Sequence, residues 1–310
     1  MRPERMPFAT APLPRERIPL TTRRSFLTAL LLTAVPAVRG FAQTSALSSP
    51  PAGVERKLAM RIKLAGFGGA SEADIKAVLR SAAGEIWKHC PNTRFEQPGF
   101  EIYHNSKNPI THYEPSGDGC IVIGLAVEGN LWARFAYQFA HEFTHALMDH
   151  SNDSRKLWRK LEHANQWLEE SLCEMASLFC LRAMAQTWRT KPPYPNWKSY
   201  APSLADYVAK HLADPKRRLP EGQTFAVWFA AEEPDLRKRW SRDKNTVIAR
   251  QLLPLFEAEP RGWEALPSLK LGTRDVSKPL AKHLAEWSAH APAEQRAFVA
   301  KVAALFGVKV

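Results

Sequence analysis

Residues 135–148 read Phe-Ala-Tyr-Gln-Phe-Ala-His-Glu-Phe-Thr-His-Ala-Leu-Met, and this stretch constrains the fold of the rest of the chain. Its apolar residues surround much of a helical surface, which predicts a core helix over Leu131–His150. His141, Glu142 and His145 are embedded in that helix. Burying such groups without partners costs on the order of several kcal/mol. A bound metal ion would remove that cost, so the stretch predicts a metal site inside the fold.

The spacing of these three residues indicates their roles. His141 and His145 stand four residues apart, so their imidazoles share one face of the helix. Side chains at that spacing have Cβ atoms about 5–6 Å apart, close enough for both rings to bind one zinc ion. Glu142 lies one step round the helix and can take a proton from a water molecule that the metal activates. The pattern therefore predicts two metal ligands and a general base.

A zinc site that acts on a substrate needs a third protein ligand and an open position. Glu170 and Glu174 share one face of a second helix, expected over Trp167–Trp188, whose other positions are almost all apolar. Two like charges buried four residues apart repel each other. That repulsion is relieved if Glu170 binds the metal while Glu174 accepts the free ring N–H of a ligand histidine.

Other ligand patterns fit less well. The metzincin pattern would place glycine and histidine three and six residues after His145, where the chain has Met148 and Ser151. His150 lies five residues beyond His145 and therefore faces away from the two imidazoles. A deformylase-like site would use an upstream cysteine, but the surroundings of Cys120 do not match that family. The carboxylate of the second helix remains the favoured third ligand.

The His-Glu-Phe-Thr-His segment and the downstream Trp-Leu-Glu-Glu-Ser segment together resemble the gluzincin metallopeptidases, which include thermolysin-like enzymes and zinc aminopeptidases. In that family the ligand glutamate lies in a Trp-Leu-Asn-Glu-Gly-Phe run. Carried over residue by residue, the resemblance implies that His141, His145 and Glu170 bind Zn2+ and that Glu142 is the general base. It implies a zincin-like fold and hydrolysis of a peptide or protein substrate.

The chain departs from the gluzincin pattern in two respects. Glu169 replaces the usual asparagine before the ligand, so it competes with Glu170 for the metal; only Glu170 has a carboxylate, Glu174, four residues on. No Gly-Ala-Met-Glu-Asn motif precedes the first helix, so recognition of a free substrate amine is not implied. Asp149, four residues after the second histidine, does match an aspartate outside the ligand set of the thermolysin helix.

Hydrolysis would also need a donor to the developing oxyanion. The candidates after the second helix, among which the sequence does not choose, are Tyr194, Tyr200, Tyr207 and His211. The strand expected over Cys120–Leu125, just before the first helix, resembles the edge strand on which such enzymes pair an extended substrate. An ordinary core strand is the alternative interpretation.

The pattern along the chain predicts an α+β fold, with a small N-terminal sheet and a helix followed by a mainly helical part. Strands are expected over 58–64, 100–104, 110–113 and 120–125, and a helix opens near Ser71 and runs to about His89. Further helices are expected over 204–212, 224–240, 244–257, 278–288 and 293–306, with a loop over 191–202. We predict a strand-bearing subdomain over 54–150 and a helical subdomain over 151–310 that carries the third ligand.

Residues 1–42 have the pattern of a signal peptide. Arg23 and Arg24 precede an apolar run, Phe26–Val38, that is shorter than the roughly 20 residues of a membrane-spanning helix. The paired arginines resemble the twin-arginine export signal, which implies a bacterial protein that is periplasmic or secreted. An uncleaved anchor is the alternative. Residues 43–53 are then a tether, and no other stretch is expected to span a bilayer.

The composition, 45% hydrophobic and 24% charged, is that of a globular protein and excludes a disordered or collagen-like chain. Without the seven arginines and two glutamates of residues 1–42, the net charge falls from +12 to +7. Its basic groups are expected to be solvated helix faces, so nucleic acid is not an expected partner.

Export would place the four cysteines where disulfides persist. Cys173 and Cys180 are separated by about 10.5 Å along one helix and cannot pair without strain. A Cys90–Cys120 bridge is one alternative, and four free thiols are the other.

Two functions fit these patterns. The first is an exported zinc-dependent peptidase. The second is a catalytically silent binding protein in which a structural zinc ties two helices together. A structural site usually has four protein ligands, and no ligand or base position is degraded, which favours the peptidase. The natural substrate, the cleavage preference and the oligomeric state are left open.

Overall fold

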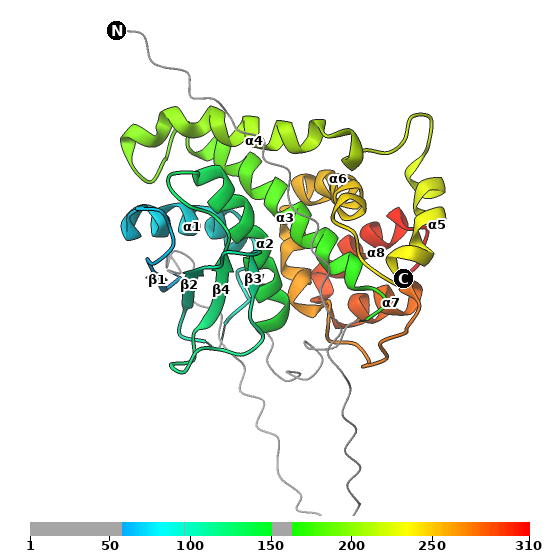
Figure 1. Cartoon of the computed structure of the whole chain (residues 1–310). Helices are drawn as coiled ribbons and strands as arrows, with labels where there is room; N and C mark the ends of the chain where they lie inside the picture. The colour runs from blue at the N-terminus through cyan, green and yellow to red at the C-terminus, as the bar shows by residue number, and fades with distance from the viewer. Residues whose placement is uncertain (1–57, 96, 151–162) are drawn as a thin grey trace, which may run out of the picture. The chain divides into compact units, whose positions relative to one another are not determined.

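The computed structural model describes residues 58–95, 97–150 and 163–310. The predicted signal peptide and tether, and Ser151 of the metzincin comparison, lie outside these residues. Figure 1 shows a small sheet with the helices α1 and α2 near it, followed by a C-terminal part built from helices. The chain therefore has the mixed helix-and-strand composition that the sequence predicts, with a small sheet and a mainly helical C-terminal part.

The sheet has four strands in the order β1-β2-β4-β3. Their bounds are β1 (Met60–Lys63), β2 (Phe100–His104), β3 (Ile110–Thr111) and β4 (Ile121–Leu125). The strands β1, β2 and β4 run parallel, and β3 pairs antiparallel with β4. Ile62 aligns with Ile102, and Ile102 with Ile123, so a row of buried β-branched side chains crosses the three parallel strands.

The strand β4 is not the edge strand that its sequence resembles. It pairs with β2 on one side and with β3 on the other, so its backbone is engaged in ladders on both sides. Ile121, Ile123 and Leu125 are fully buried. The prediction of a substrate-pairing edge at 120–125 is therefore wrong, and the alternative, a core strand, is confirmed. The two-residue strand β3 forms that edge of the sheet instead.

The helix α1 (Glu72–Trp87) begins where the sequence predicts. The Ser71 hydroxyl accepts a hydrogen bond from the Asp74 backbone N–H at 3.1 Å, and Glu72 and Asp74 lie in the first turn. Such a cap satisfies one of the free N–H groups at a helix start, and acidic residues there favour the helix dipole. The buried side of α1, including Val78 and Ile86, contacts α2 and α3.

The helices α2 (Trp132–His150) and α3 (Gln166–Thr187) form the centre of the fold. The helix α2 contacts α1 and β4 as well as α3, while α3 contacts α1, α2, α4 and α6. Figure 1 shows α3 between α2 and α6. A helix with neighbours on so many sides must be apolar almost all round, as the sequence of α3 is.

The remaining helices follow the predicted positions with two corrections. Their bounds are α4 (Ala201–Ala213), α5 (Phe225–Leu236), α6 (Arg242–Ala258), α7 (Leu280–His290) and α8 (Arg296–Leu305), with 3-10 helices at Pro195–Tyr200, Pro215–Arg217, Pro260–Ser268 and Ala293–Gln295. The loop expected over 191–202 contains the first of these 3-10 helices and the start of α4. Proline in a first turn has a φ angle suited to a helix start. The prolines of this stretch therefore begin helices and do not mark the expected loop. The helix α5 also ends at Leu236, earlier than the expected Trp240.

None of the helices in the described part of the chain combines the length and the apolar composition needed to cross a membrane.

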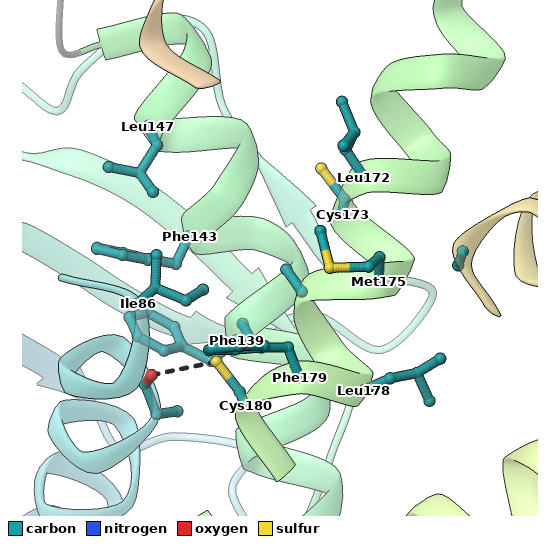
Figure 2. Packing of buried hydrophobic residues seen from close by; sticks show 14 of the residues in the cluster. Ile86, Phe139, Phe143, Leu147, Leu172, Cys173, Met175, Leu178, Phe179 and Cys180 are labelled. Atoms are coloured by element: carbon teal, nitrogen blue, oxygen red, sulfur yellow. Dashed lines mark hydrogen bonds between the residues drawn. The ribbon is translucent and has the colours of Figure 1, made fainter. Parts of the chain in front are cut away.

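Phe143, in the middle of the His-Glu-Phe-Thr-His segment, anchors α2 to the rest of the core. It is fully buried, and its ring packs against Trp87, Phe95 and Phe100, with centroid distances of 5.7 to 6.1 Å. Figure 2 shows Phe143 and Leu147 on the side of α2 away from Cys173 of α3. One face of α2 thus packs in the aromatic core. Residues on its other side lie towards α3, where they can form a site.

We expect Phe143→Ala to lower the free energy of unfolding by about 3–5 kcal/mol, because it leaves a cavity among these rings. Denaturant unfolding followed by circular dichroism measures this change. The control is Val227→Ala at a side chain 62% exposed, which should change the free energy of unfolding by less than about 0.5 kcal/mol. A similar effect of both substitutions would contradict this account of the core.

Candidate metal centre

The three predicted metal ligands meet where α2 packs against α3. Nε2 of His141 lies 3.4 Å from Oε2 of Glu170, and Nε2 of His145 lies 3.8 Å from Oε1 of the same carboxylate. The two imidazole centroids are 5.1 Å apart, as the four-residue spacing on α2 requires. The structure therefore brings His141, His145 and Glu170 together, with both Nε2 atoms directed towards one carboxylate.

Cys173 joins the two histidines in an overlapping group that does not include Glu170. One ligand atom from each of His141, His145 and Cys173 lies within 4.8 Å of the others, and such a group could hold a metal ion. Cys173 follows Glu170 by three residues and so shares its face of α3. Burial raises the pKa of the Cys173 thiol to about 12. From the sequence, this cysteine is expected to be a disulfide partner or a free thiol and not a ligand, although its three-residue spacing from Glu170 already indicates a shared face of the helix.

All four cysteines are free thiols in the structure. The Cys90–Cys120 bridge that the sequence left open is not formed. Cys180 lies two turns beyond Cys173 on α3, and its thiol donates a hydrogen bond to the Ala82 carbonyl oxygen at 3.3 Å (Figure 2). Two of the cysteines therefore occupy one buried helix with different surroundings, one beside the imidazoles and one inside the apolar core.

Glu169 holds His145 from the opposite side of its ring. Nδ1 of His145 is 2.8 Å from Oε1 of Glu169. A carboxylate can only accept, so Nδ1 donates this hydrogen bond, and in a neutral ring the lone pair would be at Nε2, on the side of Glu170. Of the two adjacent glutamates, Glu169 thus lies behind the histidine, whereas Glu170 faces both Nε2 atoms.

Exposure separates these two carboxylates as well. The side chains of His141 and Glu170 are 20% and 14% exposed, whereas that of Glu169 is 7% exposed. The side of the cluster that carries Glu170 is therefore the more accessible to solvent.

Glu174 does not make the hydrogen bond that the sequence suggests. Its Oε2 lies 4.0 Å from Nδ1 of His141, too far for a hydrogen bond. Its Oε1 instead accepts hydrogen bonds from the hydroxyls of Tyr137 and Thr246, the latter at 3.0 Å. These two donors hold the carboxylate beside His141 and satisfy it there, so the expectation is corrected.

The predicted base Glu142 is tied to the edge of the sheet. The Thr111 hydroxyl of β3 lies 2.9 Å from Oε2 of Glu142 and 2.8 Å from its backbone oxygen. Glu142 is 4% exposed. The short strand β3 therefore supplies a donor that orients the candidate base. Nothing in the isolated Ile110–Thr111 segment could have revealed this contact, because it depends on how the sheet packs on α2.

A buried lysine connects Glu169 to Asp149. Nζ of Lys270 lies 2.6 Å from Oε1 of Glu169 and 2.7 Å from Oδ1 of Asp149. Burial alone would lower the pKa of Lys270, but the two carboxylates outweigh it and raise this pKa above its usual value. Burial likewise opposes ionisation of Glu169, yet Lys270 and the histidines around it keep its pKa well below the usual range.

This network places Asp149 outside the proposed ligand set, as the sequence resemblance implies. Asp149 reaches the histidine through Lys270 and Glu169, which form a chain of charges behind His145. The long separation in sequence between Lys270 and its partners explains why sequence reasoning missed it.

The oxyanion-donor candidates divide into two groups. Tyr194 packs against Trp197, and the Tyr200 hydroxyl accepts the Ala133 backbone N–H at 3.3 Å. The other two candidates, Tyr207 and His211, pack on the ring of Tyr137, the residue that binds Glu174, at centroid distances of 5.7 and 4.5 Å. Burial lowers the pKa of His211. Tyr207 and His211 are therefore the two whose rings contact the surroundings of the cluster.

Tyr113 follows β3 and precedes α2. It is not among the oxyanion-donor candidates from the sequence, all of which follow the second predicted helix. It is 38% exposed. Burial of its ring raises the pKa of its hydroxyl, and the nearby charge of Glu169 acts in the same direction. Tyr113 is therefore a further tyrosine hydroxyl near Glu169.

The ligands that the sequence disfavoured are engaged elsewhere. His150 donates a ring N–H to the His112 carbonyl oxygen at 3.1 Å. Cys120 does not belong to the group of possible metal-binding side chains within residues 58–95, 97–150 and 163–310.

No family model, curated protein or solved structure matches the chain. The function of the cluster is therefore argued from its own geometry and chemistry.

If the cluster holds a divalent metal ion, Lys270→Met should weaken its binding by about 10–100-fold, because Glu169 loses the cation that orients it behind His145. Competition with a chromophoric chelator measures the affinity. The comparison variant is Lys278→Met, which removes another buried lysine, one whose Nζ lies 2.6 Å from Glu286 rather than beside Glu169. Both variants should lose stability, but only Lys270→Met should lose affinity; equal affinities would contradict the role of this network.

Proposed function

We propose that the protein is a zinc-dependent peptidase with a zincin-like fold of the gluzincin type, which hydrolyses peptide bonds in a peptide or protein substrate after export by the twin-arginine route. One observation carries this proposal. The Nε2 atoms of His141 and His145 and the carboxylate of Glu170 converge at 3.4 and 3.8 Å, and the Nδ1 atom of His145 is held by a second carboxylate.

The donor set suits zinc. Imidazole nitrogen and carboxylate oxygen are common zinc ligands, and two histidines with one glutamate leave a fourth position open, as catalytic sites do. A zinc-binding histidine almost always donates its other ring N–H to a carboxylate or carbonyl, which fixes the ring and its tautomer. The hydrogen bond from His145 to Glu169 is of this kind. These features support a resident metal ion.

Zinc, when bound, would supply a Lewis acid that polarises the substrate carbonyl and lowers the pKa of water. The residues around it would do the rest. Glu142 would take a proton from the attacking water and pass it to the departing amine. The hydrogen bond from Thr111 fixes Oε2 of this carboxylate and leaves its second oxygen for the proton. Tyr207 and His211 remain the candidates for a donor to the oxyanion, since their rings reach the surroundings of the cluster.

One observation favours the second function, a catalytically silent binding protein with a structural zinc. Cys173 places a fourth potential ligand atom beside the imidazoles. A structural site is usually closed by four protein ligands, whereas a catalytic one keeps a position open. The peptidase remains the better supported function because a structural site has no use for a base such as Glu142.

We expect Glu142→Gln to keep the metal and to lower hydrolysis by about 10²–10⁴-fold, since the amide cannot accept the proton. Zinc stoichiometry and cleavage of a mixed peptide library are measured on the same preparation. Glu264→Gln is the matched control: this glutamate is also 4% exposed, but it accepts a hydrogen bond from the backbone of Asn92. Undiminished cleavage by Glu142→Gln would refute the role of the base. A zinc-loaded wild type that cleaves nothing would favour the silent protein.

The two adjacent glutamates should separate in a metal-binding assay. Glu170→Ala removes a direct ligand and should abolish stoichiometric zinc binding after dialysis. Glu169→Ala removes the shared partner of His145 Nδ1 and Lys270 but no proposed ligand, and should weaken binding by about 10–100-fold. The reverse order of effects would show that Glu169 is the ligand.

A further inference from the structure

The cluster contains one donor more than a hydrolytic zinc site requires. Glu170 lies 3.4 and 3.8 Å from the two Nε2 atoms, and Cys173 has its sulfur within 4.8 Å of a ring nitrogen of each of the same histidines. His141 and His145 are therefore shared by two potential ligands from one face of α3. Glu170 and Cys173, both on α3, thus each lie near the two histidines of α2, although Glu170 is not part of the group whose ligand atoms lie within 4.8 Å of one another.

The chemistry of Cys173 suits a ligand better than a packing residue. Thiolate sulfur is among the strongest zinc donors, and zinc in sites with four protein ligands is tetrahedral. The thiol is fully buried beside the polar imidazoles and carboxylates of the cluster. Cys180, on the same helix, shows the alternative, because its sulfur is surrounded by core residues and bonds to a backbone carbonyl (Figure 2).

We propose that Cys173 is a fourth ligand of the same zinc ion, and that the peptidase is latent while the sulfur is bound. This inference rests on the metal binding of the proposed function. On zinc binding, the thiol loses its proton to solvent as the sulfur–zinc bond forms. When that bond breaks, the sulfur regains a proton from solvent and a coordination position becomes open. Glu142 can act on a water molecule only in this second state.

The four side chains would have different roles. His141, His145 and Glu170 would hold the ion in both states, while Cys173 would be present in one. A chain with four protein ligands would bind its ion more tightly and hydrolyse more slowly than a chain with three. The two functions considered above then become two states of one site, with the sulfur deciding between them.

Cobalt substitution tests this assignment without relying on activity. A cobalt ion bound by thiolate sulfur shows an intense sulfur-to-metal charge-transfer band in the near ultraviolet, which nitrogen and oxygen ligands do not give. We expect the band in cobalt-loaded wild type and in the matched control Cys180→Ala, and its loss in Cys173→Ala and Cys173→Ser. The serine variant keeps the side-chain volume, and circular dichroism establishes that it is folded.

Affinity and rate complete the test. Loss of an outer partner of a ligand already costs about 10–100-fold in metal affinity, so loss of Cys173 as a direct ligand should weaken cobalt binding at least tenfold. At saturating zinc, Cys173→Ala should cleave the mixed peptide library several-fold faster than wild type and Cys180→Ala.

Each outcome is decisive. Cobalt uptake without the charge-transfer band, or a band that survives in Cys173→Ser, would overturn the inference and leave the proposed function intact. A Cys173→Ala variant that is no faster at saturating zinc would overturn the latency. No cobalt uptake by wild type at all would overturn the proposed function together with the inference.

Discussion

The packing of α2 against α3 encloses two imidazoles and two adjacent carboxylates, and the rest of the structure depends on satisfying them. The pair formed by His145 and Glu169 is held by a group from a different part of the chain. Glu169 takes the N–H of His145 and is itself paired with Lys270, which follows the 3-10 helix Pro260–Ser268. Charges buried in this way are costly unless they are paired and hydrogen-bonded. The helices and the sheet edge thus converge on one polar centre within an otherwise apolar core.

The sequence predicted the parts of this centre that depend on local geometry. Residues four apart on a helix must share a face, so His141 and His145 could be paired, and Glu170 stood out as a charge in an apolar helix. The contacts that sequence reasoning missed join segments far apart in the chain. Thr111 and Lys270 carry no local signal, because their partners are fixed only when β3 and the C-terminal part dock on α2 and α3.

Two predictions were wrong for a related reason: the edge strand at 120–125 and the hydrogen bond from a ligand histidine to Glu174. The Ile-Val-Ile-Gly-Leu run of β4 is apolar throughout, which indicates a strand but not which strands lie beside it, so this pattern was compatible with an edge and with the interior. Likewise, Glu174 was assigned to a histidine from its position on the helix, whereas Tyr137 and Thr246 satisfy one of its oxygens. Spacing along one element identifies a face; competition among the neighbours of that face decides the partner.

The position of Lys270 also bears on how the protein matures. Its partners Asp149 and Glu169 lie about a hundred residues earlier. A nascent chain that stops before residue 270 therefore contains both histidines and both glutamates, but has two interior carboxylates without their cation. The centre can reach its finished geometry only after the segment that follows Pro260–Ser268 has packed against α2 and α3. The ion pair thus couples assembly of the candidate metal centre to docking of that segment, and a product truncated before residue 270 would have a destabilised interior.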